Sequence, residues 1–481
     1  MATPIPENRA SFSLAEIASA TGGQVRAGRA TSVTGVVTDT RATLEGKLFV
    51  ALRGERFDGH AFVAQALAGG AAAALVDRDV DVPPSASLIR VASTLDALGA
   101  LANAHRRRWG GQVVAVAGSA GKTTTRHAIG AVLRARLAGA VHELPGNLNN
   151  RIGVPMVLLA AEARHRAAVV EIGTNQRGEV EALTRVVQPD LAVLTLIALE
   201  HAEGIGDLDA VELEEGALLR GLPAGAAALC NGDDPRCRRQ LERSPAAVRR
   251  TYGAGPDNDY RLCERVPLGI EGSRLCIERP RVAAGQLELR VPHLGLPGAL
   301  ATLAAIAAAE QIGGSAAPDL AAIERALAAC EREAGRLLAT LLGDGSVLID
   351  DAYNANPASV ESSLSVAREI ATARGARLFL VLGDMLELGD HSDAAHRQTA
   401  EAVRAAAPAE LIAVGPAATA FLDPVRQAGG RAEGRPQADA ETAALLIERV
   451  RPGDVVLVKA SRGIGADRLA KALLEAKGRA A

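Results

Sequence analysis

The sequence has little lysine, few aromatic side chains and almost no net charge. Only five of its 53 Lys and Arg residues are lysines, namely Lys47, Lys122, Lys459, Lys471 and Lys477. Aromatic residues make up 2% of the 481-residue chain, and the formal net charge is −3. Proteins that bind nucleic acid through a broad positive field, or stack single-stranded bases on aromatic rings, need the features that this chain lacks. We therefore expect no nucleic-acid binding.

Paired cysteines and long apolar runs are also missing from the sequence. The five cysteines are odd in number and form no C-x-x-C pair, which disfavours a disulfide framework or a zinc knuckle. We find no apolar run of about 18 residues, so no membrane span is expected. The N-terminal segment carries Glu7, Arg9 and Glu16 and lacks the apolar core of a signal peptide. These features indicate a cytoplasmic protein.

Alternating strand-like and helix-like segments predict an α/β protein of three domains. A chain of 481 residues is too long for one compact core. Changes of pattern place the domains at 1–108, 109–315 and 316–481. In the first domain we expect a helix over 11–21, capped by Ser11 or Ser13 and ended by Gly22 and Gly23, and a second helix over 62–68. Strands are expected at 33–37 and 48–52.

The second and third domains have the pattern of parallel sheets covered by helices. Their strand candidates are uninterrupted apolar runs, which is typical of strands buried on both faces. A doubly wound central sheet is predicted from strands at 112–117, 167–172, 191–196 and 226–230, with antiparallel strands within 253–292 and an Ala-rich helix over 299–312, ended by Gly313 and Gly314. A smaller, Rossmann-like third domain is predicted from strands at 346–349, 378–382, 411–414 and 454–459 and helices at 359–373, 394–406 and 438–450.

One segment carries a chemical signature on its own. It follows the strand 112–117, precedes a helix, and resembles a short P-loop made of Gly118, Ser119, Ala120, Gly121, Lys122, Thr123 and Thr124. Glycines allow backbone N–H groups to surround a phosphate, and the helix N-terminus adds partial positive charge. Lys122 would contact the outer phosphates and Thr123 would reach Mg²⁺. The alternative is a chance glycine turn, but the strand-loop-helix context favours ATP or GTP binding.

Further motifs resemble the Mur ligases, the ATP-dependent amino-acid ligases of peptidoglycan precursor synthesis. The resemblance covers nearly the whole chain. Its motifs are TDTR at 38–41, GKLFVAL at 46–52, FDGH at 57–60, GNLNN at 146–150, DDAYNANP at 350–357, GDMLELG at 383–389 and VKASR at 458–462. The string at 350–357 most resembles the type that adds D-alanyl-D-alanine to UDP-N-acetylmuramoyl-tripeptide. The resemblance implies ATP and Mg²⁺ as cofactors and these two molecules as substrates.

The resemblance also implies roles for individual residues. Such ligases phosphorylate a carboxylate to an acyl phosphate, which an amine then attacks, so positioning and charge neutralisation matter most. Glu171 and His201 would be metal ligands together with Thr123, although a strand-end carboxylate or a lone histidine can be purely structural. Arg336, Asp351 and Asn231 would lie near the nucleotide, although Asn231 fits a polar turn equally well. The implied substrate-binding residues are Thr40, Arg41, Asp58, His60, Asn149, Asn150, Tyr353, Asn354 and Asn356.

The sequence departs from the family pattern at two functional positions. Most of these ligases carry a carbamylated lysine about fourteen residues after the metal-binding histidine, but this chain has Glu215 there and no lysine between 122 and 459. We hypothesise that Glu215, or its neighbour Glu214, supplies the missing negative charge; a solvated acidic helix face is the alternative. The family's asparagine-containing nucleotide motif falls on 295–301, which contains no asparagine.

Three functional hypotheses follow from these observations. The first is an active amide ligase, with Lys122, Glu171, His201 and Glu215 as its catalytic residues. The second is a degenerate paralogue that binds nucleotide or a UDP-muramyl peptide without turnover. The third is a sister ligase of the folylpolyglutamate or MurE type, which the segment 350–357 disfavours. The retention of Lys122, Thr123 and the other motif residues favours the first, in a protein expected to be a monomer.

Overall fold

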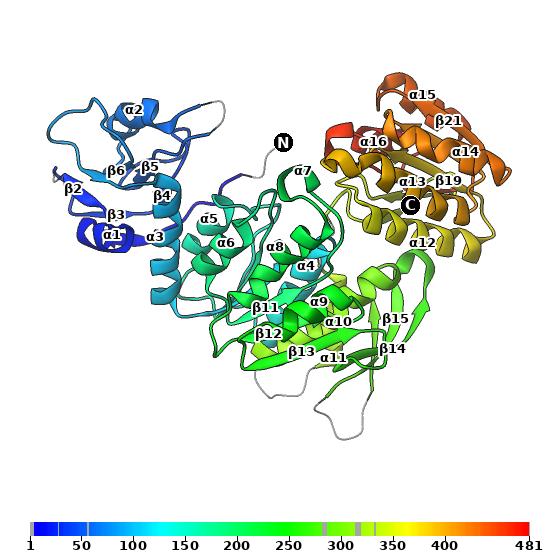
Figure 1. Ribbon diagram of the computed structural model, residues 1–481, viewed down its shortest axis with the longest axis horizontal. Coiled ribbons are helices and arrows are strands. Elements are labelled where there is room, and N and C mark those ends of the chain that lie inside the picture. The colour runs from blue at the N-terminus through cyan, green and yellow to red at the C-terminus, as the bar shows by residue number, and fades with distance from the viewer. Residues whose placement is uncertain are drawn as a thin grey trace.

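A computed structural model describes residues 4–26, 28–54, 57–280, 286–312, 319–330 and 333–480. It contains a mixed α/β fold with three separate main sheets, which follow one another along the chain (Figure 1). The first and third domains flank the central domain on opposite sides. The expected helix stop at Gly313 and Gly314, and the expected start of the third domain at 316, lie outside the described residues.

The first domain contains a five-stranded sheet in the order β2-β7-β6-β5-β4 and a small two-stranded sheet of β1 and β3. The expected helix over 11–21 begins only at its fourth residue. Ser13 caps it by accepting a hydrogen bond from the Glu16 backbone N–H at 3.1 Å, and Ser11–Ser13 instead form β1, paired with β3. The elements are β1 (Ser11–Ser13), α1 (Leu14–Thr21), β2 (Gln24–Arg26), β3 (Ser32–Thr34), β4 (Val36–Val37), β5 (Leu48–Val50), η1 (Gly59–Phe62), α2 (Val63–Ala68), β6 (Ala73–Val76), β7 (Leu88–Arg90) and α3 (Thr94–Trp109).

A glycine divides the strand that was expected at 33–37. Gly35 has φ +99°, and a Cβ atom there would lie 2.7 Å from the Asn8 carbonyl oxygen. This left-handed backbone interrupts the extended run, so that β3 pairs with β1 while β4 joins the main sheet. Periodicity alone could not reveal the break because the flanking valines continue the apolar pattern.

The central domain is built on a nine-stranded sheet in the order β16-β15-β14-β13-β12-β11-β8-β10-β9. Strands β8 to β14 of this sheet are parallel to one another. The expectation of antiparallel strands within 253–292 holds for β15 and β16, whereas β14 in the same range pairs in parallel with β13. The strands are β8 (Gln112–Ala117), β9 (Val141–His142), β10 (Ala167–Glu171), β11 (Leu191–Leu194), β12 (Ala227–Asn231), β13 (Val248–Gly253), β14 (Tyr260–Pro267), β15 (Ser273–Glu278) and β16 (Leu287–Val291).

Helices cover both faces of this sheet, as a doubly wound fold requires. Along β8, Val113 and Ala115 belong to one apolar core, whereas Val114 and Val116 belong to the other. The first core contains residues of α3, α5, α6, α8 and α9, and the second contains residues of α4, α10 and α11. These helices are α4 (Lys122–Arg136), α5 (Gly153–Leu159), α6 (Glu179–Val187), α7 (Ala202–Ile205), α8 (Leu208–Arg220), α9 (Pro235–Glu242), α10 (Gly295–Ile312) and α11 (Leu320–Ala328).

Helix α10 is apolar and longer than the helix predicted over 299–312. It begins at Gly295, four residues earlier than predicted, and its 18 residues have a mean hydropathy of 1.3, enough by length and composition to cross a membrane. However, 72% of this helix is buried inside the protein, where Ala305 and Leu303 lie in the central core. The apolar character of α10 therefore serves packing within the domain.

The third domain has a six-stranded sheet in the order β17-β18-β22-β19-β20-β21, parallel except for β17. The sequence did not predict β17 or β21, because neither is an uninterrupted apolar run. The strands are β17 (Leu338–Leu341), β18 (Val347–Asp350), β19 (Leu378–Gly383), β20 (Glu410–Val414), β21 (Arg431–Arg435) and β22 (Val455–Lys459). The helices are α12 (Pro357–Arg374), α13 (Ser392–Ala405), α14 (Leu422–Gln427), α15 (Ala440–Arg449) and α16 (Asp467–Lys477), with short 3₁₀ turns that include η3 (Gly389–His391).

Candidate active site

The predicted P-loop lies between β8 and α4, at the carboxyl edge of the central sheet. Gly118 has φ +128°, and a Cβ atom there would lie 2.2 Å from the Thr195 hydroxyl oxygen, so only glycine fits. Gly121 has φ +81° and directly precedes α4. The Lys122 ammonium donates a hydrogen bond to the Gly118 carbonyl oxygen at 2.5 Å. The loop thus has the closed curvature and helix N-terminus of an anion-binding loop.

Glu171, at the end of β10, is placed directly beside the P-loop. The Thr123 hydroxyl donates to Glu171 Oε2 at 2.8 Å, and the Asn149 amide donates to Glu171 Oε1 at 2.9 Å. Arg126 Nε lies 3.7 Å from the same carboxylate. This neighbourhood follows from the parallel pairing of β10 with β8, which aligns the carboxyl ends of the two strands.

Two buried carboxyl groups lie beneath the P-loop on the side of Lys122. Glu215 is fully buried and accepts a hydrogen bond from the Gly118 backbone N–H at 2.7 Å. Glu200, which sequence reasoning did not single out, has Oε1 3.8 Å from Lys122 Nζ. Burial raises the pKa of Glu200 well above its usual range and also raises the pKa of Glu215. Although burial opposes the charge on Lys122, the carboxylates Glu200, Glu215 and Glu171 outweigh it and raise the pKa of this lysine.

The structure separates the two glutamates that the sequence left as alternatives. Glu214 accepts hydrogen bonds from the backbone N–H groups of Gly178 and Val180 at 2.6 and 2.8 Å, so it holds the start of α6. Glu215 alone of the pair contacts the P-loop. Neither residue belongs to a solvated face, because both are buried in α8.

His201 lies at the start of α7, on the edge of the central domain that meets the third domain. Its Nε2 atom is 3.8 Å from Glu200 Oε2, and its Nδ1 atom is 2.5 Å from Glu387 Oε2 of the third domain. Burial lowers the pKa of His201, which favours the neutral imidazole that can bind a metal. Glu387 was not predicted as a functional residue, because it is distant in sequence from every residue it contacts here.

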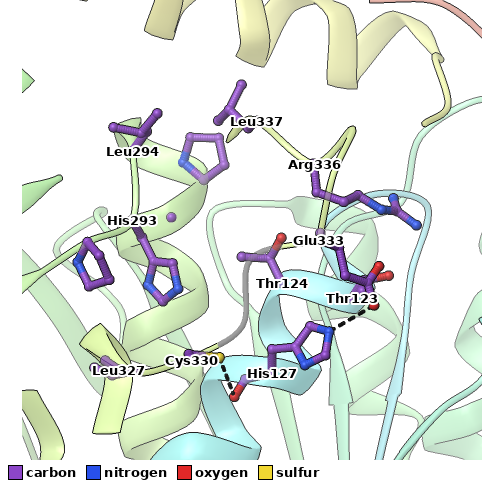
Figure 2. Close-up of a pocket in the computed structure, with 14 residues that line it drawn as sticks. Thr123, Thr124, His127, His293, Leu294, Leu327, Cys330, Glu333, Arg336 and Leu337 are labelled. Atoms are coloured by element: carbon purple, nitrogen blue, oxygen red, sulfur yellow. Dashed lines mark hydrogen bonds and ion pairs between the residues drawn. The ribbon is translucent and has the colours of Figure 1, made fainter. Parts of the chain in front are cut away.

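The third domain brings Arg336 to the pocket beside the P-loop. The Arg336 guanidinium stacks on the Tyr353 ring at 3.7 Å, and its buried Nε atom has no hydrogen-bond partner among the described residues. Figure 2 shows Glu333 beside Thr123 and His127, with Arg336 next to them, in the lining of a pocket of about 100 Å³. A buried, unpartnered guanidinium nitrogen near a P-loop is suited to a phosphate oxygen.

Asp351 and the asparagines of the segment 350–357 have structural partners. Asp351 accepts hydrogen bonds from the Leu337 backbone N–H at 2.9 Å and from Lys459 Nζ at 2.5 Å. The Asn354 carbonyl oxygen accepts from the same lysine at 3.1 Å. Asn356 reaches the central domain, where its amide donates to the Ser119 carbonyl oxygen at 3.1 Å. Asp351 and Lys459 therefore secure the linker that carries Arg336.

The segment 295–301, where the family's nucleotide motif was expected, lines the same pocket. Pro297 and Gly298 form part of its wall, together with His293, Leu294 and Leu327. His293 Nδ1 lies 3.0 Å from the buried Thr302 hydroxyl oxygen. Because Gly121 and Thr123 line the same pocket, this segment lies beside the P-loop although it contains no asparagine.

Other predicted residues lie away from the P-loop or have local roles. Asn150 caps the start of α5 by accepting from the Gly153 N–H at 2.8 Å, and Asn231 accepts from the Asp233 N–H at 3.1 Å in a polar turn. Four of the implied substrate-binding residues belong to the first domain: Thr40, Arg41, Asp58 and His60. The His60 ring is buried between Asp58 and Asp77, 2.7 and 3.1 Å from their carboxylates. Thr40 is half-buried, and Arg41 is exposed and paired with Asp39.

The donor set at the P-loop fits Mg²⁺. Thr123 and Glu171 place a hydroxyl and a carboxylate together, and Glu200 and Glu215 each have one buried oxygen without a hydrogen-bond donor among the described residues. No three His, Cys, Asp or Glu side chains in the described part of the chain converge closely enough to hold a metal alone. Mg²⁺ at nucleotide sites commonly takes one or two carboxylates and completes its shell with phosphate oxygens and water.

The fold and this site define a three-domain α/β protein with a P-loop nucleotide site shared between its second and third domains. Three family models match the chain: "Mur ligase family, catalytic domain" over 32–106, "Mur ligase middle domain" over 116–309 and "Mur ligase, glutamate ligase domain" over 335–462. The chain belongs to the Mur ligase family, which confirms the resemblance seen in its motifs.

Individual relatives indicate which type of Mur ligase this chain is most similar to. The chain is 33% identical to the UDP-N-acetylmuramoyl-tripeptide–D-alanyl-D-alanine ligase of Bacillus subtilis, over 92% of this chain and 94% of that protein. It is 34% identical to the ligase of the same name from Escherichia coli, over 92% and 93% of the two chains. A crystal structure of MurF from Acinetobacter baumannii matches with a TM-score of 0.84 and 29% identity, covering 98% of this chain and all of the other. This match confirms the predicted three-domain α/β architecture.

Proposed function

We propose that this protein is an ATP-dependent amide ligase that joins D-alanyl-D-alanine to UDP-N-acetylmuramoyl-tripeptide in peptidoglycan precursor synthesis. The observation that carries the proposal is the convergence of Lys122, Thr123 and Glu171 of the central domain with Arg336 of the third domain around one P-loop. Similarity to ligases of this activity over 92% of the chain supports the choice of substrates. ATP and Mg²⁺ are the proposed cofactors.

The reaction needs two chemical steps. In the first, the γ-phosphoryl group of ATP moves to a carboxylate oxygen of the tripeptide, giving an acyl phosphate and ADP. In the second, the amine of D-alanyl-D-alanine attacks the acyl carbon, loses a proton, and inorganic phosphate leaves from the tetrahedral intermediate. Neither step requires a protein nucleophile, so the protein acts by positioning its substrates and neutralising charge.

The residues at the P-loop can take these roles directly. The backbone N–H groups of the loop and Lys122 bind the phosphates, and the unpartnered Nε of Arg336 contacts the transferred phosphoryl group. Thr123, Glu171 and His201 would hold Mg²⁺, and Asn149 fixes the Glu171 carboxylate. When bound, Mg²⁺ neutralises the charge that develops on the phosphate oxygens.

We also propose how the remaining parts of the chain contribute. The first domain, residues 1–108, holds the UDP part of the substrate through Thr40, Arg41, Asp58 and His60. The domains 109–315 and 316–481 carry out ligation, with Asn149, Asn150, Tyr353, Asn354 and Asn356 at or near the peptide substrates. The residues Asn231 and Asp351 remain proposed as neighbours of the nucleotide, and the protein is proposed to be a cytoplasmic monomer.

Glu215 is proposed to supply the negative charge that a carbamylated lysine supplies in most relatives. It is fully buried, it contacts the P-loop at Gly118, and it raises the pKa of Lys122. A glutamate carries this charge without any reaction with carbon dioxide. The activity of the wild-type protein should therefore be independent of bicarbonate.

Substitution of Glu215 tests this role. We expect Glu215→Gln to lower kcat by about 10- to 100-fold at saturating Mg²⁺, the range found when a group supporting a metal site is removed. The exposed Glu181→Gln serves as the control and should leave kcat unchanged. Glu215→Lys should recover activity only in the presence of bicarbonate, because carbamylation of the lysine restores a carboxylate-like anion. Unchanged turnover in Glu215→Gln would contradict the proposal.

Substrate-dependent release of ADP tests the proposed function. We expect ADP to form only when ATP, Mg²⁺, UDP-N-acetylmuramoyl-tripeptide and D-alanyl-D-alanine are all present. Lys122→Met should abolish the release, since no other described ammonium group contacts the P-loop. ADP binding without turnover on any acceptor dipeptide would instead support the degenerate paralogue.

A further inference from the structure

Glu387 links the third domain to the histidine proposed as a metal ligand. It lies in the loop between β19 and η3, and its Oε2 atom is 2.5 Å from His201 Nδ1. The Glu387 backbone carbonyl oxygen also accepts a hydrogen bond from the Glu203 N–H, at 3.2 Å. Gly389 packs against the Glu203 side chain, since a Cβ atom at Gly389 would lie 3.3 Å from Glu203 Cγ. Side-chain and backbone contacts of one residue therefore join α7 to the third domain (Figure 1).

Both partners have a backbone conformation that is unusual for their residue type. His201 has φ +47° and Glu387 has φ +65°, in the left-handed region that non-glycine residues rarely adopt. Such strained residues persist where the surroundings over-determine them, and they often lie at functional sites. The two side chains meet across the domain boundary, with His201 Nδ1 2.5 Å from Glu387 Oε2.

Neighbouring residues hold the Glu387 loop in place. The Met385 backbone N–H donates to His396 Nε2 at 3.0 Å, and the Leu386 N–H donates to the Ser461 hydroxyl oxygen at 2.9 Å. The His396 ring is buried and its Nδ1 lies 2.8 Å from the Ser392 carbonyl oxygen. The position of the Glu387 carboxylate is therefore set by the third domain, and the contact with His201 forms when that domain lies against α7.

The bond to Glu387 determines which imidazole nitrogen of His201 is available. A carboxylate 2.5 Å from Nδ1 keeps the proton on that atom, which leaves the Nε2 lone pair free. Nε2 lies 3.8 Å from Glu200 Oε2, and the other oxygen of this carboxylate lies 3.8 Å from Lys122 Nζ of the P-loop. Histidines that bind metals commonly donate their other N–H to such a carboxylate, which fixes the ring and increases its basicity.

We propose that Glu387 is a positioning residue that orients His201 toward Mg²⁺ and does so only when the third domain is docked. The metal site thus depends on the third domain through a residue that does not itself touch metal or nucleotide. This inference rests on the proposed Mg²⁺ site of the ligase. It goes beyond that site because it makes the affinity for the metal dependent on domain docking.

Binding of Mn²⁺ to the ADP complex, measured by electron paramagnetic resonance, tests the proposal without requiring turnover. We expect Glu387→Ala to weaken Mn²⁺ binding by about 10- to 100-fold, as is typical when the partner of a metal-bound histidine is removed. Glu387→Gln should recover part of the affinity, because its amide oxygen still accepts a hydrogen bond from Nδ1–H. Asp390→Asn, three residues further along the chain in η3 and also exposed, is the matched control and should bind like wild type.

A double-mutant cycle separates positioning from damage to the loop. In a His201→Ala background, Glu387→Ala should cause no further loss of Mn²⁺ affinity, since the residue through which it acts is gone. Equal losses with and without His201, or wild-type affinity in Glu387→Ala, would overturn the proposal. Absence of ligation by the wild-type protein would overturn the proposed function instead, while Mn²⁺ binding would still report on Glu387.

Discussion

Two of the five lysines contact carboxylates in the protein interior, one in the central domain and one in the third domain. Lys122 lies in the P-loop among Glu200, Glu215 and Glu171, whereas Lys459 is 2% exposed and bonds Asp351 in the third domain. In a chain that otherwise uses arginine, both positions require a compact charge on a flexible stem rather than a planar guanidinium. Lys122 can contact phosphate, whereas Lys459 has a structural role. It bonds the Asp351 carboxylate, which in turn accepts a hydrogen bond from the linker that carries Arg336.

Removal of Lys459 should therefore destabilise the third domain and disturb the nucleotide site. We expect Lys459→Met to lower the free energy of unfolding of this domain by about 3 kcal/mol, because it leaves the Asp351 carboxylate buried without its cation. The KM for ATP should also rise, since Leu337 and Arg336 lose their support. Lys471→Met is the control: this lysine is 75% exposed and should be replaceable without measurable change. Denaturant unfolding together with steady-state kinetics would measure both effects, and equal stability of the two variants would contradict this account.

The sequence could indicate several site residues but not their exact roles. Lys122, Thr123 and Glu171 were predictable because a P-loop between strand and helix, and a carboxylate at a parallel strand end, meet at the same sheet edge. The choice between Glu214 and Glu215 was not, because neighbouring positions of α8 differ by only about 100° around the helix and both are buried. Asp351 was expected at the nucleotide, and only the three-dimensional structure reveals its bonds to Lys459 and Leu337.

At the scale of elements, α4 is connected to the linker before β17 through a half-buried histidine. His127 of α4 has Nδ1 2.7 Å from Glu143 and Nε2 3.0 Å from Glu333. Burial opposes protonation, but hydrogen bonds to Glu143 and Glu333 outweigh it and raise the pKa of His127. The hydrogen bond from His127 is the main cause that lowers the pKa of Glu333 to about 2. This contact joins the P-loop helix to the linker that carries Arg336.

The contribution of this contact to stability should depend on pH. Because the folded pKa of His127 is raised, its contribution is complete below the unfolded value of about 6.5 and is lost as the pH rises through the folded pKa. The contribution of Glu333 depends on pH in the opposite direction because its pKa is lowered. This contribution is present above about pH 4.5 and is lost as the pH falls toward 2. We therefore expect Glu333→Gln to destabilise the protein most between about pH 4.5 and 6.5 and less above the raised pKa of His127.

Nuclear magnetic resonance titration of His127 would measure its interaction with Glu333 directly. Its pKa should fall in Glu333→Gln, whereas the exposed Glu475→Gln should leave it unchanged. An unaltered His127 pKa in Glu333→Gln would show that the two side chains do not interact in solution. The sequence offered no sign of this pair, because the residues are 206 positions apart and each has an unremarkable local context.

At the scale of the whole molecule, three domains bring separate parts of one site together. The domain layout was predictable, because alternating apolar strands and helices are a local pattern that repeats along the chain. The contacts between domains were not, because they join residues with no shared periodicity. Examples are Asn356 with Ser119, Glu387 with His201, and the ion pair of Arg265 in β14 with Glu369 in α12. These contacts place Arg336 and Glu387 of the third domain at the P-loop and at α7.

The central claim is that the protein activates a peptide carboxylate as an acyl phosphate. Transfer of ¹⁸O from a carboxylate-labelled UDP-N-acetylmuramoyl-tripeptide, followed by mass spectrometry of the products, tests this claim most directly. We predict that each inorganic phosphate formed with D-alanyl-D-alanine present will contain one ¹⁸O atom, since the labelled oxygen leaves with the phosphoryl group. Release of unlabelled phosphate together with the amide product, or ATP hydrolysis without any amide, would contradict the account.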